Sequence, residues 1–550
     1  MLIRSAKHHF VCASDDFSKQ LAESVSDTNY SEFYGYCFKG STLHHDRFSC
    51  PRINELFASY ASNCGVFCAL YRKSENETIV FTDPLGQYPV FYYEQDGRFF
   101  VSNDFWEISK SVSSRRINED VIYDYVTYFS PLNQETLSYK VRRLTAHQIL
   151  QIRKTSSGYT FNVCEMPELR YDGTYDDLLI VGSERFKERA TAVLALGQPV
   201  VHLTGGADSR LSFSALAACG YKGPVFSFGN GFSQDRLVHQ SLVQSMKLEQ
   251  GSIKWFGGAI NSTYKLLHAV KAFNGLKSNN LTNWASGESD RHLEVTGYFG
   301  EGLLKGFGQF WGPNRTASPF KYAKTVSAFP SQVFDHVEKR IQAQSKEILE
   351  RHDGNLLLAE TEYYLRNRSA AHFGAHSVVN NRKFVSVDLI YDPMLTSLLR
   401  VCPYPEKAIK DGAILIDLIK LIHSEELAIF PYDDRFVTSY DRRSDALYEI
   451  GTFSCFSNLR LMRKELQPLN VDIHQTASRE NEFSFAEVKI SSLSEIITLE
   501  PFAELIRTFP LLDLSHLPKC VGEKRALERI SLSSLSAAYW LLNQQQQSCI

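Results

Sequence analysis

The residues with the clearest chemical potential form one short run, Leu203-Thr204-Gly205-Gly206-Ala207-Asp208-Ser209-Arg210. A buried strand is expected over 199–203 and a helix from 208, so the glycines form the turn between them. Adjacent glycines let backbone N–H groups approach an anion closely, and the hydroxyls of Thr204 and Ser209 add donors. The helix that follows presents unpaired N–H groups and its positive end to the same place. These residues predict a phosphate-binding turn.

Asp208 is expected to serve a phosphate through Mg²⁺, because a carboxylate in direct contact would repel it. Mg²⁺ is commonly held by one or two carboxylates together with phosphate oxygens. The run lacks the GxxxxGK[ST] pattern of a Walker loop, which argues against cleavage at the γ-phosphate. We therefore expect release of pyrophosphate and transfer of AMP. An ordinary strand, Gly-Gly turn and helix without a ligand is the alternative interpretation.

The composition of the chain argues against nucleic-acid-binding, membrane-spanning and secreted proteins. A chain of 550 residues with 43% hydrophobic and 22% charged residues is expected to form two or three globular domains. The net charge is only −3 and no long basic run occurs, so no nucleic acid partner is expected. No apolar stretch is long enough to span a membrane or to serve as a secretion signal. Eleven cysteines without paired spacing indicate thiols in a reducing cytoplasm.

The first 165 residues alternate short apolar or aromatic runs with polar turns, which is typical of antiparallel sheets. The expected elements are strands at 64–71, 78–82, 90–93 and 98–102, a helix at 119–127 and a strand pair near 140–152. A linker is expected at 164–177.

Beyond the linker, strands alternate with helices, which predicts a parallel sheet with a ligand site at the carboxyl ends of its strands. The expected elements are strands at 199–203, 224–229 and 253–256 and helices at 208–219, 234–247 and 262–273. From about 325 onward the pattern is mainly helical, with helices expected at 333–350, 356–372 and 408–424 and little sign of strands.

The run LTGGADS resembles the SGGxDS pyrophosphate loop of the N-type ATP pyrophosphatases, with threonine in place of the first serine. A turn-rich β region before it and helices after it resemble the asparagine synthetase superfamily, including β-lactam synthetases and lasso-peptide macrolactam cyclases. The segment 81–93, FTDPLGQYPVFYY, is similar to the family's RDPxGxxPLYY hairpin. The resemblance implies a degenerate glutaminase-like N-terminal-nucleophile (Ntn) domain over 1–165, an α/β ATP-pyrophosphatase core over 178–325 and a mainly helical continuation over 326–550.

A second motif, residues 296–306 (TGYFGEGLLKG), is similar to the TGYGSD motif of β-lactam synthetases. Aligned on Thr-Gly-Tyr, it implies that Glu301 shares Mg²⁺ with Asp208. Tyr298 would then help to deprotonate an attacking amine, and Gly297 would line the nucleotide site. A register shifted by three residues matches Gly-Glu-Gly instead and makes Glu301 the catalytic carboxylate.

Further nucleotide contacts are expected from residues around the loop. Ser227 closes the next strand, where adenine would lie against the backbone, and Asp235 would contact ribose or cap its helix. Arg210 would point either toward phosphate or outward. Arg366 and Arg368 would reach phosphate or lie at the surface, the surface being favoured for Arg368.

Two departures from the family pattern bear on activity. The glutaminases carry a cysteine after the initiator methionine, whereas Leu2 stands here, and Cys12 would become a terminal nucleophile only after an unusual cleavage. Nitrogen from glutamine is therefore not expected. The family's transition-state lysine has no clear counterpart either, since residues 431–443 offer only Arg435, Arg442 and Arg443, and arginine cannot share a proton as lysine does.

The resemblance implies an ATP- and Mg²⁺-dependent ligase that adenylates a small-molecule or peptide carboxylate and joins it to an amine. The product would be a macrolactam or a β-lactam, with possible partner proteins from a biosynthetic cluster. Asparagine synthetase-like amidation of asparagine precursors or sugar acids with ammonia is one alternative. A nucleotide-binding relative without catalysis is the other.

Overall fold

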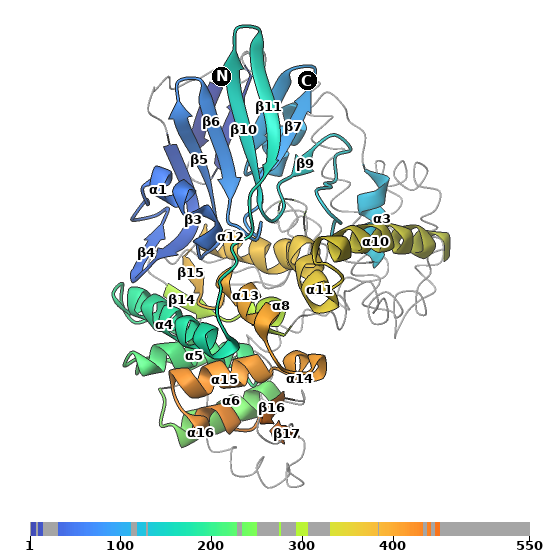
Figure 1. The fold of residues 1–550 in the computed structure, drawn as a ribbon. Coiled ribbons are helices and arrows are strands. Elements are labelled where there is room, and N and C mark those ends of the chain that lie inside the picture. The colour runs from blue at the N-terminus through green and yellow to red at the C-terminus, as the bar shows by residue number, and fades with distance from the viewer. Residues whose placement is uncertain are drawn as a thin grey trace, which may run out of the picture.

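The structure is a computed structural model that describes residues 2–6, 9–14, 31–111, 118–127, 130–227, 234–249, 274, 276, 293–305, 331–382, 384–432, 437–441 and 446–450. Within these ranges the chain has a mixed α/β architecture (Figure 1). No described helix is long and apolar enough to cross a membrane.

Two antiparallel sheets from the first 165 residues lie face to face. One sheet has the order β1-β2-β8-β7-β9, and the other has the order β11-β10-β6-β5-β3-β4. The strands are β1 (Leu2–Ala6), β2 (His9–Ala13), β3 (Ser31–Lys39), β4 (Thr42–His45), β5 (Phe67–Ser74), β6 (Glu77–Thr82), β7 (Phe91–Gln95), β8 (Arg98–Ser102), β9 (Arg142–Arg143), β10 (Gln148–Thr155) and β11 (Gly158–Glu165).

Alternation along the strands decides which residues fill the space between the sheets. Tyr34 on β3 points into this core, where its ring stacks on Phe10 of β2, while its neighbour Phe33 joins a second cluster on the other face. Successive side chains in a strand point to opposite faces, so an unbroken apolar run supplies both. The buried strands therefore carry apolar residues on both sides of each sheet.

Short helices cover the outer faces of the two sheets. Helix α1 (Ile53–Ala58), followed by a 3₁₀ turn at Tyr60–Ser62, packs on the six-stranded sheet. Helix α2 (Phe105–Ser111) covers the five-stranded sheet through the edge-to-face contact of Phe105 with Phe91. The first part of the chain is thus layered as helix, sheet, sheet and helix.

A four-stranded parallel sheet forms the centre of the second part, with the order β13-β12-β14-β15. Its strands are β12 (Val200–His202), β13 (Val225–Phe226), β14 (Leu293–Thr296) and β15 (Val385–Asp388). From β12 the chain moves to one side to form β13, and β14 then pairs with the other side of β12. The order reverses between β12 and β14, and in open α/β sheets ligands bind in the crevice at such a point, outside the carboxyl ends of the strands.

Helices surround the parallel sheet. Figure 1 shows α4, α5 and α15 stacked below the two antiparallel sheets, with α10 and α12 crossing beneath those sheets. The helices are α3 (Glu119–Thr127), α4 (Tyr175–Leu194), α5 (Ala207–Ala218), α6 (Gln234–Ser245), α8 (Gly300–Leu304), α10 (Ser331–Arg351), α11 (Leu356–Tyr364), a π-helical stretch (Leu365–Gly374), α12 (Ala375–Asn381), α13 (Met394–Val401), α14 (Glu406–Lys410), α15 (Ala413–Ile422) and α16 (Glu425–Ile429). A hairpin of β16 (Val437–Asp441) and β17 (Ala446–Ile450) follows.

Most expected elements occur near their predicted positions, and several differ. The helix expected at 408–424 is divided at Asp411 and Gly412 into α14 and α15, and the strand β14 was not expected. Residues 365–372, expected to continue a helix from 356, adopt π-helical geometry. The strand β15 was not expected, because four residues between helices carry almost no periodicity. The strand predicted at 253–256 and the helix at 262–273 lie outside the described residues.

The π-helical stretch presses against a turn of the antiparallel sheets. A Cβ on Gly374 would lie 2.3 Å from the Gln87 carbonyl oxygen. The Gln87 amide donates to the Leu365 carbonyl (3.1 Å), and the Ser369 hydroxyl donates back to Gln87 (2.8 Å). Tyr391 adds a hydrogen bond from its hydroxyl to Asp83 in the same turn. The turn at 83–88 is therefore fixed to the second part of the chain.

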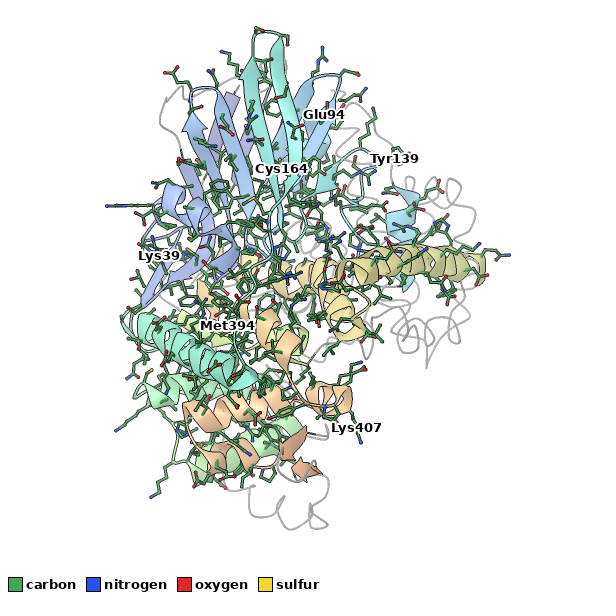
Figure 2. All side chains as sticks on the ribbon, viewed as in Figure 1. Lys39, Glu94, Tyr139, Cys164, Met394 and Lys407 are labelled. Carbon is green, nitrogen blue, oxygen red and sulfur yellow. The ribbon has the colours of Figure 1, made fainter. Side chains whose placement is uncertain are left out.

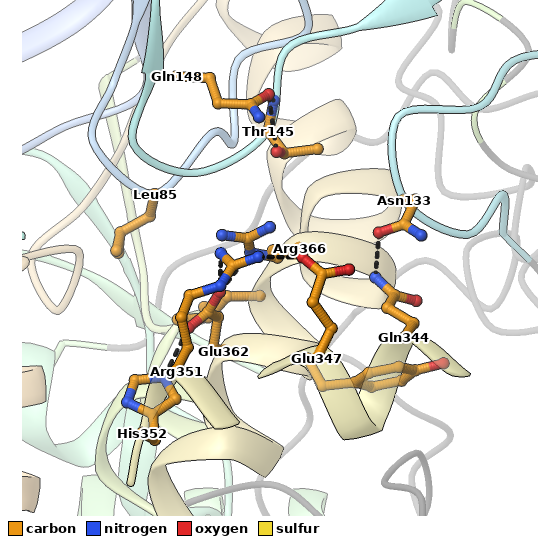
Figure 3. Close-up of polar contacts among 12 residues, drawn as sticks. Leu85, Asn133, Thr145, Gln148, Gln344, Glu347, Arg351, His352, Glu362 and Arg366 are labelled. Atoms are coloured by element: carbon orange, nitrogen blue, oxygen red, sulfur yellow. Dashed lines mark hydrogen bonds and ion pairs between the residues drawn. The ribbon is translucent and has the colours of Figure 1, made fainter. Parts of the chain in front are cut away.

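An ion-pair cluster lies beside this contact, with Leu85 of the turn above it (Figure 3). Glu362 accepts from His352 and pairs with Arg351 (3.1 Å) and Arg366 (2.6 Å). Burial alone would raise the pKa of Glu362, but the His352 hydrogen bond and the positive charges of Arg366 and Arg351 lower it to about 2. This carboxylate is fully engaged in holding the helices together.

Gly374→Ala is expected to destabilise the protein by about 1–3 kcal/mol, because the added methyl group would displace the Gln87 backbone. The matched control is Gly182→Ala in α4, where a Cβ would meet only the Cε of Met394 at 3.4 Å and a Leu418 methyl at 3.6 Å; Met394 is labelled in Figure 2. The control should be neutral or stabilise the helix by about 0.5–1 kcal/mol. Thermal unfolding of both variants tests this, and equal midpoints would contradict it.

Candidate functional site

The glycine turn connects the carboxyl end of β12 to the first turn of α5. Gly206 is the N-cap of α5 in an extended conformation and offers no side-chain acceptor to the first amides of the helix. Helix N-termini leave four N–H groups without intrahelical partners. The start of α5 therefore presents donors and a positive dipole end at the crevice between β12 and β14.

Two hydroxyl groups hold the shape of this turn. The Thr204 N–H donates to the Ser209 Oγ (3.0 Å), and the Gly206 N–H donates to the Thr204 Oγ1 (3.1 Å). The two hydroxyl oxygens lie 3.1 Å apart. The turn is thus tightly preorganised, and both predicted hydroxyl groups lie inside it.

A carboxylate already occupies one amide of the turn. The Gly205 N–H donates to Oδ1 of Asp235, at the start of α6, over 2.9 Å. Asp235 therefore holds the loop, a role beyond the two expected for it, which were a ribose contact and a helix cap. An anionic oxygen bonded here shows that the Gly205 amide faces outward from the turn to an acceptor.

The second glycine motif packs directly against the first. Gly297 follows β14, and a Cβ on it would lie 2.9 Å from the Asp208 carbonyl carbon. A Cβ on Gly300 would lie 2.3 Å from Oδ1 of Asp208. The two motifs, which are far apart in the sequence, therefore meet at Asp208.

Asp208 pairs with a lysine that sequence reasoning missed. Lys305 Nζ lies 2.9 Å from Asp208 Oδ2, and the two side chains are 14% and 12% exposed. The other oxygen, Oδ1, is buried and has no hydrogen-bond partner among the described residues. A lysine within the second glycine motif was the available signal, but its direction could not be deduced from spacing.

The site offers part of a Mg²⁺ ligand set. The described residues contain no group of three or more metal-ligating side chains. Asp208 supplies one carboxylate with an unpartnered oxygen, and Mg²⁺ can complete its octahedral shell from phosphate and water. Glu301 lies in α8, next to Gly300, but its side chain is outside the described residues. The donors present are compatible with Mg²⁺ that arrives with a phosphate ligand.

Tyr298 lies half-buried between aromatic rings. Its ring stacks on Phe373 (5.4 Å between centroids, 5° between planes) and meets His202 edge-on. Burial raises the pKa of Tyr298 well above its usual value, and the charges of Glu294 and Asp388 raise it further. The phenol thus retains its proton, which favours a hydrogen-bond donor over the proton acceptor expected from the sequence.

Asp388, at the end of β15, organises the loop that carries Tyr298. Its Oδ2 accepts from the Thr296 hydroxyl (3.0 Å) and the Tyr298 N–H (2.5 Å), and its Oδ1 accepts from the Ile390 N–H (2.8 Å). Burial raises the pKa of Asp388 to about 6 despite these hydrogen bonds. Sequence reasoning missed this residue because its strand was not recognised.

Arg210 is directed away from the turn. Its guanidinium donates to the carbonyls of Phe430 (2.6 Å) and Pro431 (2.9 Å) and lies 3.7 Å above the ring of Tyr432. Its cation therefore braces the segment after α16 against α5. The expectation that Arg210 adds a cation to phosphate has no support in this geometry.

Among the described residues, the burial and partners of the remaining sequence-predicted site residues give no support for a phosphate contact. Ser227 is buried after β13, and its carbonyl accepts from Arg236 (2.7 Å), so this backbone oxygen is already bonded. Arg366 belongs to the Glu362 cluster. Arg368 is only 7% exposed, so the expectation that it lies at the surface is wrong. Residues 433–436 and 442–445, which hold Arg435, Arg442 and Arg443, lie outside the described residues.

Cys12 occupies the middle of β2, paired with Ile3 on one side and Val101 on the other. Burial raises the pKa of its thiol to about 12. A thiol that is buried and protonated is a poor nucleophile. Both its burial and its raised pKa argue against a nucleophilic role for Cys12 in the folded chain.

No protein-family model matches this chain, and no curated protein matches it.

Asp388→Asn should flatten the pH dependence of stability. Because the pKa of Asp388 is raised to about 6 on folding, the folded chain binds its proton more tightly. The stability from this group is full below about pH 4 and is lost as pH rises toward 6, by about 1.4 kcal/mol per pH unit. Asparagine cannot titrate, so the variant's unfolding free energy should fall less steeply over this window.

Urea unfolding at several pH values between about 4 and 7 measures this slope. In the variant an NH2 group replaces one of the two oxygens that accept these hydrogen bonds. The variant should therefore be less stable, and the slope is the informative quantity. Asp96→Asn, at an exposed turn, is the control and should keep the wild-type slope. A wild-type slope in Asp388→Asn would contradict the assignment.

Proposed function

We propose that this chain is an ATP-dependent, AMP-forming amide ligase related to the asparagine synthetase superfamily. The observation that carries the proposal is the meeting of two glycine motifs at Asp208, beside the open start of α5 and at the strand-order reversal of a parallel sheet. Donors for a polyanion and a carboxylate for its metal ion converge there, which suits pyrophosphate release.

The reaction has two balanced steps. An oxygen of the substrate carboxylate attacks the α-phosphorus of ATP, and the bond to the bridging oxygen breaks to release pyrophosphate. A substrate amine then attacks the acyl carbon of the acyl-adenylate, AMP leaves with the shared oxygen, and the amine gives up a proton. The products are an amide, AMP and pyrophosphate.

The described residues have distinct parts in the first step. The backbone amides of Ala207 and Asp208, at the start of α5, would bind the departing diphosphate. The Thr204 and Ser209 hydroxyls keep the turn in shape. Asp208, together with Glu301, would hold Mg²⁺. When bound, Mg²⁺ supplies positive charge that neutralises the leaving group. In the second step Tyr298, which holds its proton, would orient the acyl group or the amine as a donor.

The architecture of the first part supports a degenerate glutaminase domain. A helix, sheet, sheet and helix layering is what the Ntn resemblance implies, and the parallel sheet suits an N-type ATP pyrophosphatase core. Cys12 is buried with a raised pKa and position 2 is leucine, so ammonia from glutamine is not part of the proposal. The amine then comes from the substrate itself, which favours macrolactam or β-lactam formation.

A nucleotide-binding protein without catalysis is the second candidate. Two observations favour it: Lys305 already engages the Asp208 carboxylate, and Tyr298 is a poor proton acceptor. Asparagine synthetase-like use of ammonia is a third candidate, and no contact among the described residues favours it.

Exchange of radiolabelled pyrophosphate into ATP separates the first two candidates. With a panel of peptide and small amino-acid carboxylates, a ligase should show exchange that depends on one substrate class. Asp208→Asn should reduce exchange by at least about 100-fold, because it removes the charge that holds the metal ion. Asp172→Asn, at an exposed position, should leave exchange unchanged.

Two outcomes would count against the ligase. If ATP binds but no carboxylate supports exchange, the non-catalytic candidate is favoured. If Asp208→Asn exchanges as fast as the wild type, the assignment of the site fails.

A further inference from the structure

Lys305 is placed to do more than neutralise Asp208. Its ammonium lies 2.9 Å from Asp208 Oδ2, at the first turn of α5, and the Lys305 side chain is 14% exposed. The ion pair is therefore not sealed from solvent, and it lies directly beside the glycine turn.

The charge balance around the turn makes this cation significant. Two carboxylates lie at the turn. Asp208 forms the ion pair with Lys305, and Asp235 accepts the hydrogen bond from the Gly205 N–H. Among the described residues, Lys305 is the cation that forms an ion pair at the turn. The guanidinium of Arg210 donates instead to the carbonyls of Phe430 and Pro431. Without a nearby cation, two carboxylates would repel a diphosphate.

The chemistry of lysine suits a phosphate contact. An ammonium has three N–H donors on a flexible four-carbon stem and binds phosphate as a point charge. One donor satisfies Asp208 Oδ2, which leaves two that can turn to phosphate oxygens. Lys305 is also the residue that ends α8, so its stem begins on the same short segment as Gly300.

We propose that Lys305 contacts the diphosphate of the bound nucleotide and stabilises it as it leaves. The inference rests on the proposed function and names a substrate-contacting residue for it. Lys305 thereby supplies a positive charge at the turn from the second glycine motif, while Asp208 holds the ammonium in position when no nucleotide is bound.

Calorimetric titration of the full chain with pyrophosphate and, separately, with AMP tests the proposal in the presence of Mg²⁺. Lys305→Met keeps an unbranched side chain that is one atom shorter and removes its charge. It should weaken pyrophosphate binding by about 10- to 100-fold, the usual loss for a charge-assisted hydrogen bond. AMP affinity should stay within about two-fold, because AMP lacks the diphosphate. Lys305→Arg should recover most of the pyrophosphate affinity.

The matched control is Lys222→Met, which removes an exposed lysine just before β13, at the opposite end of the sheet. It should bind both ligands as the wild type does. Thermal unfolding of each variant shows whether a loss of binding comes from a loss of structure.

Each other outcome overturns the proposal in a recognisable way. Wild-type pyrophosphate affinity in Lys305→Met would remove Lys305 from the site and leave the proposed function intact. Tighter binding would mean that the ion pair blocks the turn. Equal loss of pyrophosphate and AMP with a lower unfolding temperature would make the pair structural. If the wild type itself binds neither pyrophosphate nor AMP, the proposed function fails first.

Discussion

The site depends on the absence of side chains at two positions, Gly297 and Gly300. Strands β12 and β14 are neighbours in a parallel sheet, so the segments that leave them begin only about 4.8 Å apart. A Cβ at either glycine would overlap atoms of Asp208. Only bare backbone lets the second motif lie on the first turn of α5. That contact brings Lys305 to Asp208 and sets the height of Tyr298 above the sheet.

The antiparallel sheets are coupled to this site through contacts that leave little room for adjustment. The turn at 83–88 bonds to the π-helical stretch, where Gly374 lies against the Gln87 backbone. The next residue toward the N-terminus, Phe373, stacks on Tyr298. A displacement of the turn at 83–88 would therefore shift Gly374 and Phe373, and through Phe373 it would reach Tyr298 in the candidate site. The antiparallel sheets therefore help to hold the candidate site in position.

The sequence predicted the helices, strands and turns that depend mainly on residues close together in the chain. The helix at Glu119–Thr127 and the strand at Glu77–Thr82 lie where periodicity placed them, and α5 begins beside the predicted glycine turn. Parallel pairing of β12 and β13 followed from the alternation of strands and helices, whereas β14 was not predicted. The convergence of the two glycine motifs was expected from resemblance, and the structure brings their backbones together.

What sequence did not reveal depends on contacts between distant segments. The four residues of β15 form a strand because β14 offers them an open edge, and that edge also positions Asp388. Arg210 turned out to bind carbonyls more than 200 residues away, which no spacing rule could indicate. Lys305 was visible in the second motif, but its partner was set by the folding of α8 against α5.

A crystal structure with Mg²⁺ and an ATP analogue that cannot be cleaved between the α- and β-phosphates would test the central claim most directly. We expect the β- and γ-phosphates to lie on the amides of Ala207 and Asp208 at the start of α5, with the metal ion at Asp208. The analogue bound elsewhere, away from the start of α5, would contradict the account.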